Sequence, residues 1–149
     1  MSINMFASPS SYVQGHGALL QSAPYLKRLG TTAVLLADPM PFKLYGQKFV
    51  DYLQKEGVDV KVVQFQGESS DNEIKRVDQI AKDEKAELII GFGGGKTSDT
   101  AKASADDLKI KVAVLPTLAS TDAPCSRLSV IYKDSGEFEK YRFFNANPD

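Results

Sequence analysis

The sequence predicts an α/β fold: a doubly wound, mostly parallel sheet with helices on both faces and a β-hairpin near the carboxyl end. Short continuous apolar segments alternate along the chain with longer stretches of helical periodicity. The short apolar segments are rich in Val, Ile and Leu, which is typical of parallel strands buried on both faces. A cluster of glycines directly follows one of them, as expected for a turn at the carboxyl end of such a strand.

The four expected strands span Ala33–Ala37, Val58–Phe65, Leu88–Gly91 and Val112–Leu115. The helices expected around them span Ala18–Leu29, Leu44–Glu56, Glu73–Glu84 and Thr97–Leu108. We expect Asp71 or Asn72 to cap the third helix, because short polar side chains accept hydrogen bonds from first-turn N–H groups. For the same reason Thr97, Asp99 and Thr100 are interpreted as helix-start residues rather than ligand contacts.

The last part of the chain predicts a β-hairpin. Apolar and polar residues alternate over Leu128–Tyr132 and again over Glu137–Phe144, and the turn between them contains Gly136. A length of 149 residues suits one domain, residues 1–149, that can bury about two thirds of its unfolded surface.

Composition excludes several classes of function. The 18 basic and 19 acidic residues leave a formal charge of -1, which favours neither nucleic acid nor an anionic membrane as partner. No apolar run is long enough to span a bilayer and the first residues lack signal-peptide features, so a cytoplasmic location is expected. Cys125 is the only cysteine, so no internal disulfide can form, and we interpret it as a small packing residue.

The turn after the third strand carries the strongest functional signal. Four of the five residues 91–95 are glycines, and Lys96 follows them at the start of a helix. Backbone without side chains lets an anion approach the first N–H groups of the helix, where Lys96 adds a positive charge. A strict Walker A motif needs glycine where Ile90 stands, and a strict dinucleotide motif needs glycine or alanine in place of Lys96. The turn therefore predicts a phosphate site of another type, and a turn without ligand is the alternative.

Three loops are expected to meet at one edge of the sheet. Asp38 ends the first strand, the glycine turn ends the third, and the segment Thr117–Asp122 follows the fourth. The carboxyl ends of parallel strands share an edge, where ligands of such sheets bind. Asp38 precedes the glycines by more than fifty residues, whereas the acid of the common Rossmann plan follows them. The fold is therefore expected to be Rossmann-like but differently wired.

Two segments resemble a known family. Residues 93–103 read GGGKTSDTAKA and residues 116–132 read PTLASTDAPCSRLSVIY. Together they resemble the cofactor-binding half of the glycerol dehydrogenases, within the metal-dependent, so-called iron-containing alcohol dehydrogenase superfamily. The Asp-Ala-Pro-Cys-Ser stretch separates this group from butanol-type and glycerol-phosphate-type relatives. The resemblance covers nearly all of the chain, which has less than half the length of a typical member.

The resemblance implies NAD as the cofactor and gives roles to particular residues. The implied cofactor-binding residues are Asp38, Gly94, Gly95, Lys96, Thr117, Ser120, Ser126, Leu128 and Tyr132, and Asp122 is implied to contact a polyol substrate. A carboxylate at Asp38 can accept both ribose hydroxyls and would repel the extra phosphate of NADP. Taken alone, Asp38 and Asp122 also suit turns, and Leu128 and Tyr132 also suit hairpin packing.

The resemblance also implies a metal, zinc in glycerol dehydrogenases, held by an aspartate and two histidines of a downstream helical domain. His16 is the only histidine of this chain, and its glycine neighbours indicate a solvent-facing loop. No metal site is therefore expected here. The expected function is the NAD-binding portion of an enzyme that oxidises glycerol to dihydroxyacetone, inactive without the metal ligands and able to form homo-oligomers.

Two other classes of function stay open. The chain could be a non-enzymatic nucleotide-binding or interaction module that exposes a partly apolar surface. It could also be an ATP-dependent phosphotransferase, because the glycine turn is close to a Walker motif. The second alternative is weaker, because no convincing magnesium-binding acid follows a suitable strand.

Overall fold

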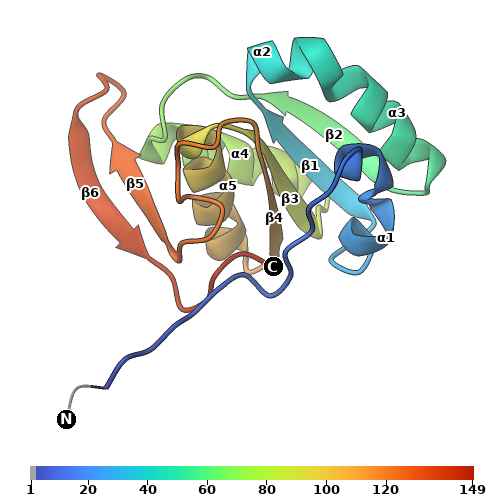
Figure 1. The fold of residues 1–149 in the computed structure, drawn as a ribbon. Coiled ribbons are helices and arrows are strands. Elements are labelled where there is room, and N and C mark those ends of the chain that lie inside the picture. The colour runs from blue at the N-terminus through green and yellow to red at the C-terminus, as the bar shows by residue number, and fades with distance from the viewer. Residues whose placement is uncertain (1–2) are drawn as a thin grey trace.

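A four-stranded parallel sheet and a separate two-stranded hairpin make up the strands of the computed structural model, which describes residues 3–149 (Figure 1). The sheet has the order β2-β1-β3-β4. Its strands are β1 (Thr32–Ala37), β2 (Asp59–Gln64), β3 (Leu88–Gly93) and β4 (Lys111–Pro116). All four predicted strands are confirmed, with ends that move by no more than two residues.

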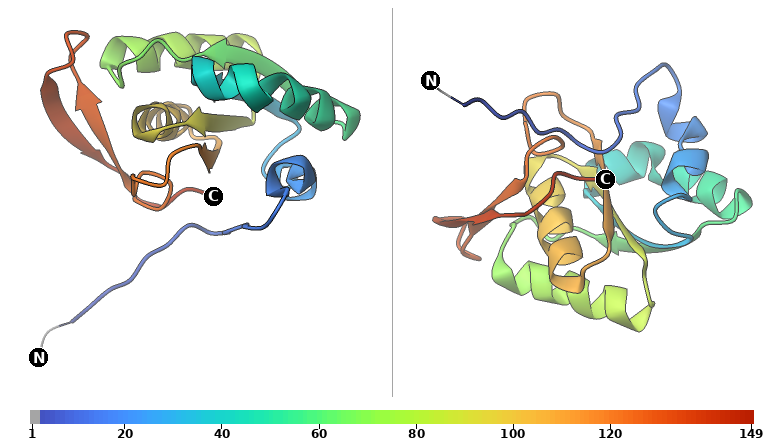
Figure 2. Two further views of the ribbon diagram at one scale, coloured as in Figure 1. Left: turned by 45° about the horizontal axis from the view of Figure 1, so that its top comes forward. Right: turned by 90° about the horizontal axis from the view of Figure 1, so that it is seen from below.

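Helices cover both faces of this sheet, as Figure 2 shows. One face carries the 3-10 helix η1 (Ala18–Gln21), α1 (Ala23–Leu26), α2 (Pro39–Pro41), the π-helical turn η2 (Phe42–Gly46) and α3 (Gln47–Lys55). The other face carries α4 (Asp71–Asp83) and α5 (Gly95–Leu108). Neighbouring residues of β1 pack on opposite faces of the sheet. Leu35 lies in the hydrophobic core formed with α1 and α3, and Leu36 lies in the core formed with α4 and α5. The doubly wound α/β prediction is confirmed.

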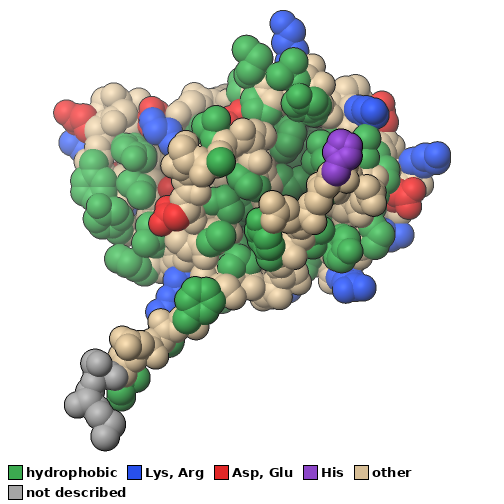
Figure 3. Space-filling model, in the orientation of Figure 1, with side chains coloured by type: hydrophobic (Ala, Val, Ile, Leu, Met, Phe, Trp, Pro, Cys, Tyr) green, Lys and Arg blue, Asp and Glu red, His purple; other side chains and the backbone are tan. Residues whose placement is uncertain are grey.

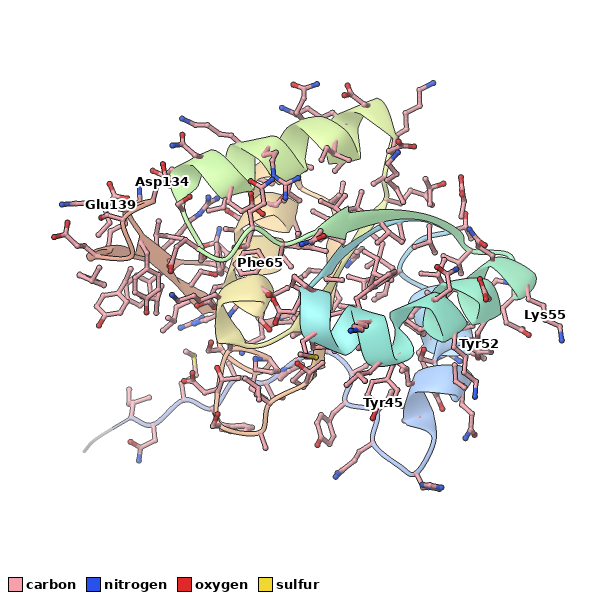
Figure 4. All side chains as sticks on the ribbon, turned by 90° about the horizontal axis from the view of Figure 1, so that it is seen from above. Tyr45, Tyr52, Lys55, Phe65, Asp134 and Glu139 are labelled. Carbon is pink, nitrogen blue, oxygen red and sulfur yellow. The ribbon has the colours of Figure 1, made fainter. Side chains whose placement is uncertain are left out.

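The first two helical segments differ from the prediction. The stretch predicted as one helix over Ala18–Leu29 is divided into η1 and α1, because Leu20 leaves helical backbone angles and Pro24 starts the second segment. The second part is linked to α3 by Tyr52, labelled in Figure 4, whose hydroxyl accepts from Ala23 N–H at 3.2 Å. The second helical segment begins at Pro39, five residues before the predicted start at Leu44, because proline fits a first helical turn.

Helix α4 begins with a capping residue that the prediction missed. Ser70, rather than Asp71 or Asn72, is its N-cap, and Ser70 Oγ accepts from Glu73 N–H at 3.2 Å. Ser70 has extended backbone angles, as an N-cap requires, whereas Asp71 and Asn72 are already helical. Ser70 and Glu73 have the spacing of a capping-box sequence, which is a local signal for this N-cap, although the Glu73 carboxylate accepts from Gln66 N–H and Arg76 instead.

The predicted hairpin is confirmed as β5 (Leu128–Tyr132) and β6 (Phe138–Phe143), an antiparallel pair. It packs on α5, where Ser129 Oγ donates to the Asp99 carbonyl at 2.8 Å. Figure 4 shows Asp134 and Glu139 on this hairpin, at the opposite end of the molecule from Lys55 of α3. Within residues 3–149, no helix has the length and apolar character needed to cross a bilayer.

Candidate functional site

The glycine turn between β3 and α5 is closely approached by the end of β1 and by the loop after β4. A side chain on Gly93 would collide with the Asp38 carboxylate, and a Cβ on Gly95 would lie 2.9 Å from Thr121 Oγ1. A Cβ on Gly91, two residues before Gly93 in β3, would lie 2.9 Å from the Ala101 methyl group of α5. Close approach therefore favours glycine at these positions, since a contact below 3 Å forces a neighbouring side chain to move.

Asp38 ties the end of β1 to this turn. Its Oδ2 accepts from Gly94 N–H at 2.8 Å, and its Oδ1 accepts from the hydroxyl of Thr97. Thr97 lies in the first turn of α5, as the sequence indicated, but its hydroxyl donates to Asp38 rather than accepting from a first-turn N–H. The Asp38 side chain is half-buried, and a carboxylate with two such bonds keeps further lone pairs for a ligand.

The first N–H groups of α5 are open to a ligand. Among residues 3–149, no protein acceptor is hydrogen-bonded to the backbone N–H of Gly95 or Lys96. Helix N-termini in this state attract anions through free donors and the helix dipole.

A cleft of about 1130 Å³ opens beside these groups, across the carboxyl ends of β2, β1 and β3. Its lining includes Asp38, Gly94, Gly95 and Lys96, and its other wall is formed by β2, the residues that follow it and α4. Phe65, just past β2, is one of these wall residues and lies between α4 and α2 in Figure 4. The geometry can hold an elongated anionic ligand.

Every positive side chain lining the cleft has a carboxylate partner. Lys61 Nζ lies 3.2 Å from Glu84, and Lys96 Nζ lies 2.7 Å from Glu68. Arg76 donates to Glu73 at 2.7 Å, and this hydrogen bond raises the pKa of the arginine. Glu68 was missed by sequence reasoning, because it lies 28 residues from Lys96 and no motif connects the two.

The loop after β4 approaches the glycine turn at its start. Thr117 N–H donates to the Gly93 carbonyl at 2.9 Å, which confirms that three loops meet at this edge. Ser120 and Asp122 are exposed further along the loop. The main-chain carbonyl of Asp122 accepts from Cys125 N–H at 2.9 Å, which makes a turn there.

The same loop is anchored by a buried lysine on α5. Lys102 Nζ donates to the carbonyl oxygens of Ala123 at 2.8 Å and Ser126 at 3.3 Å, and also to that of Leu128. Asp99, one turn earlier, lies 3.1 Å from the same ammonium group. Burial raises the pKa of Asp99 and lowers that of Lys102, and in each case the charge of the partner acts in the opposite direction. Lys102 was missed, and Asp99 serves this anchor rather than the helix start.

Three further residues implied by the resemblance lie around this anchor and the turn. Ser126 Oγ is 3.2 Å from Lys102 Nζ, and the ring centroid of Tyr132 is 4.8 Å from Lys96 Nζ. Leu128 opens β5 and is half-buried. None of these three lines the cleft within the part of the chain that the structure describes.

His16 and Cys125 are both exposed. His16, the purple side chain in Figure 3, lies on the surface as the sequence indicated. Cys125 has an exposed, free side chain, so its interpretation as a packing residue is wrong, because the turn begun at Asp122 directs it outward. Over residues 3–149, no three His, Cys, Asp or Glu side chains are grouped so that they could hold a metal ion.

Comparison with known proteins decides the family. The sequence pattern described as "Iron-containing alcohol dehydrogenase" matches residues 9–149. The chain belongs to this family. The resemblance noted in the sequence is thereby confirmed.

Within the iron-containing alcohol dehydrogenases, several relatives are similar over almost the whole chain. The glycerol dehydrogenase of Pseudomonas putida is 45% identical over 95% of this chain and 39% of its own length. The glycolaldehyde reductase of Halobacterium salinarum is 42% identical over 98% of this chain and 40% of its own length. The crystal structure of glycerol dehydrogenase from Schizosaccharomyces pombe superposes with a TM-score of 0.88 at 40% identity, covering 99% of this chain and 38% of that one. The chain thus spans about 40% of the length of these relatives and corresponds to their amino-terminal part.

Proposed function

We propose that this chain is the NAD-binding part of a glycerol dehydrogenase. The observation that carries the proposal is the open N-terminus of α5, where unpaired N–H groups at Gly95 and Lys96 face a long cleft. A dinucleotide has a central diphosphate, and this is the group that such a helix start binds best. The names of the relatives at 42–45% identity support a polyol or hydroxyaldehyde as substrate.

The residues around the cleft fit the parts of NAD. Gly94, Gly95 and Lys96 would hold the diphosphate, and the remaining lone pairs of Asp38 would accept from the adenosine ribose. The cleft continues past apolar side chains, among them Phe65 and Ile80, which suit the flat adenine ring.

The nicotinamide half is assigned to the other side of the glycine turn. That side carries the implied residues Thr117, Ser120, Ser126, Leu128 and Tyr132, on the β4–β5 loop and β5. Bound NAD would supply the hydride acceptor, and the protein would orient it. Asp122, exposed on the same loop, would accept hydrogen bonds from the two hydroxyls of a diol.

Zinc is not assigned to any residue of this chain. The donor set implied for the family, one aspartate with two histidines, does not fit residues 3–149, where His16 is the single histidine and no metal-binding group is found. We therefore propose that glycerol oxidation requires groups beyond these residues. A location in the cytoplasm and a homo-oligomeric state remain predictions of the same proposal.

Titration calorimetry with NAD, and with ATP and Mg²⁺ as the comparison, tests the proposal. We expect NAD to bind with a Kd between about 0.1 and 1 mM, because an open cleft buries less of the ligand than a closed one. Backbone NMR shifts should then change first at residues 93–97 and at Asp38. Tighter binding of ATP than of NAD would favour the phosphotransferase alternative, and binding of neither would contradict the proposed function.

A further inference from the structure

The ammonium group of Lys96 is held by the carboxylate of Glu68. Lys96 Nζ donates to Glu68 Oε1 at 2.7 Å and to Oε2 at 2.8 Å, so both carboxylate oxygens take part. Glu68 lies between β2 and α4, whereas Lys96 is in the first turn of α5. Lys96 lines the cleft and Glu68 does not, so the carboxylate pairs with the lysine from outside the proposed ligand site.

The geometry allows this ion pair to open. The Lys96 side chain is 43% exposed and that of Glu68 is 28% exposed, so water reaches both partners. The aromatic ring of Tyr132, 4.8 Å from Lys96 Nζ, also favours a positive charge at this place. An anion that enters the cleft can therefore replace Glu68 as the partner of Lys96 without leaving the ammonium group buried and unpaired.

The other cations of the cleft cannot substitute for Lys96. Lys61 is paired with Glu84, and Arg76 is paired with Glu73 and also donates to the Gln64 carbonyl at 2.8 Å. In the described residues, the uncompensated attraction for an anion thus comes from the start of α5 alone. Additional attraction becomes available only when Lys96 leaves Glu68.

We propose that Glu68 competes with the diphosphate of the cofactor for Lys96 and thereby sets the affinity of the site. This inference rests on the NAD-binding function proposed above. In the free protein Glu68 neutralises Lys96. In the complex the diphosphate replaces Glu68 as the partner of Lys96, and the displaced Glu68 carboxylate repels the bound anion. The competition weakens binding of oxidised and reduced cofactor alike, and it favours their release.

The test is the isosteric substitution Glu68→Gln, with Kd measured by calorimetry for NAD and for ADP-ribose. We expect both ligands to bind about three- to tenfold more tightly, with a smaller gain at high salt because screening weakens the removed repulsion. Glu137→Gln is the matched control, since Glu137 also pairs with a lysine, Lys133, at 3.1 Å but lies outside the cleft. A gain of equal size in the control would attribute the effect to net charge and overturn the inference.

A double-mutant cycle separates this inference from the proposed function. Lys96→Ala should weaken NAD binding, and adding Glu68→Gln to it should then give no gain, because the competitor has lost its target. If wild-type protein binds NAD and Lys96→Ala weakens it, but Glu68→Gln does not tighten it, the function stands and the inference is wrong. If the wild type does not bind NAD, the proposed function itself has failed.

Discussion

Lys102 and Asp99, one turn apart on α5, form a buried ion pair with 3.1 Å between Nζ and Oδ1. The lysine holds three carbonyl groups of the segment 123–128, and the aspartate accepts from Val130 N–H at 3.1 Å. The helix that begins at the glycine turn therefore also fixes the loop and the first hairpin strand. Both halves of the proposed site are built on one rigid element.

We predict that Lys102→Met lowers the free energy of unfolding by about 3–5 kcal/mol, because it leaves the buried Asp99 carboxylate without its counter-ion and removes the donor to three carbonyl groups. Denaturant unfolding measures the change. Hydrogen exchange should rise first over residues 117–130. Lys109→Met serves as the control, since Lys109 follows the end of the same helix and pairs with Asp106 while 78% of its side chain is exposed. Similar losses for both variants would contradict the role of Lys102 as an anchor.

Gly94→Val is predicted to weaken NAD binding at least tenfold. The added side chain would begin 3.2 Å from Leu118 and stand where the diphosphate must approach the helix start. Calorimetry measures the effect, and circular dichroism checks that the fold persists. Gly15→Ala is a suitable control, because a Cβ at Gly15 meets no atom within 4 Å. Unchanged affinity in Gly94→Val would place the diphosphate elsewhere.

Asp38→Gly is predicted to weaken NAD binding by about 1–3 kcal/mol and to narrow the difference between NAD and NADP. The change removes the ribose acceptor and the charge that opposes a 2′-phosphate. Because Asp38 also holds Gly94 N–H and Thr97, Asp38→Asn should be measured beside it, since asparagine keeps one acceptor oxygen. If the affinity ratio of NAD to NADP stays constant in both variants, Asp38 only shapes the turn.

Asp122→Asn is predicted to reduce polyol turnover about ten- to hundredfold, a loss of about 1–3 kcal/mol, with little effect on NAD binding. The measurement needs a protein in which this chain is joined to a metal-binding domain. Asparagine keeps the size of the side chain but loses its charge and half of its acceptor capacity. Kinetics with glycerol and with a mono-alcohol distinguish the roles, because equal losses for both substrates would indicate that Asp122 only holds the loop.

The attachment of the hairpin is predicted to depend on pH. Arg142 of β6 donates to Asp106 at 2.8 Å and to Asp107 at 2.6 Å. Partial burial opposes the effect, but the hydrogen bond from Arg142 lowers the pKa of Asp106 below its ordinary value. The stabilisation is therefore present above the unfolded carboxyl pKa of about 4 and is lost as pH falls through the lower folded pKa.

Arg142→Gln should accordingly cost about 0.5–1 kcal/mol of unfolding free energy at pH 7, and the difference from wild type should shrink as pH falls through the lowered pKa of Asp106. Urea unfolding at several pH values measures it. Lys133→Gln, which removes the exposed pair with Glu137, should have a smaller effect throughout. A loss that does not change with pH would mean that packing of the Arg142 side chain, rather than its charge, stabilises the hairpin.

The strands and the last two helices could be predicted because their signal is local. β3 is buried at every position and so reads as a continuous apolar segment, and the strand-glycine-helix junction has its own sequence pattern. The cap at Ser70 is also a local signal, but Asp71 and Asn72 beside it are equally suitable residue types. The break before Pro24 is local as well, but the apolar periodicity continues across it. Local errors of this kind shift the ends of elements without changing the fold.

The ion pairs of the site could not be predicted from the sequence. Glu68 reaches Lys96 and Lys102 reaches Leu128 only because the sheet brings together segments 26 or more residues apart. A lysine within GGGKTSDTAKA gives no indication of whether its ammonium group meets a ligand, a carboxylate or a carbonyl. That choice depends on burial, which differs between Lys96 and Lys102 on the same helix.

The way in which Lys102 holds its loop bears on how the proposed substrate-binding loop can change in evolution. The ammonium group contacts main-chain carbonyls, and every amino acid carries one. Side chains at exposed positions such as Ser120 and Asp122 can therefore be exchanged while the path of the loop is retained. A lineage that keeps this one lysine and its aspartate can vary the chemistry presented to a substrate in single mutational steps, without first having to rebuild the support beneath it.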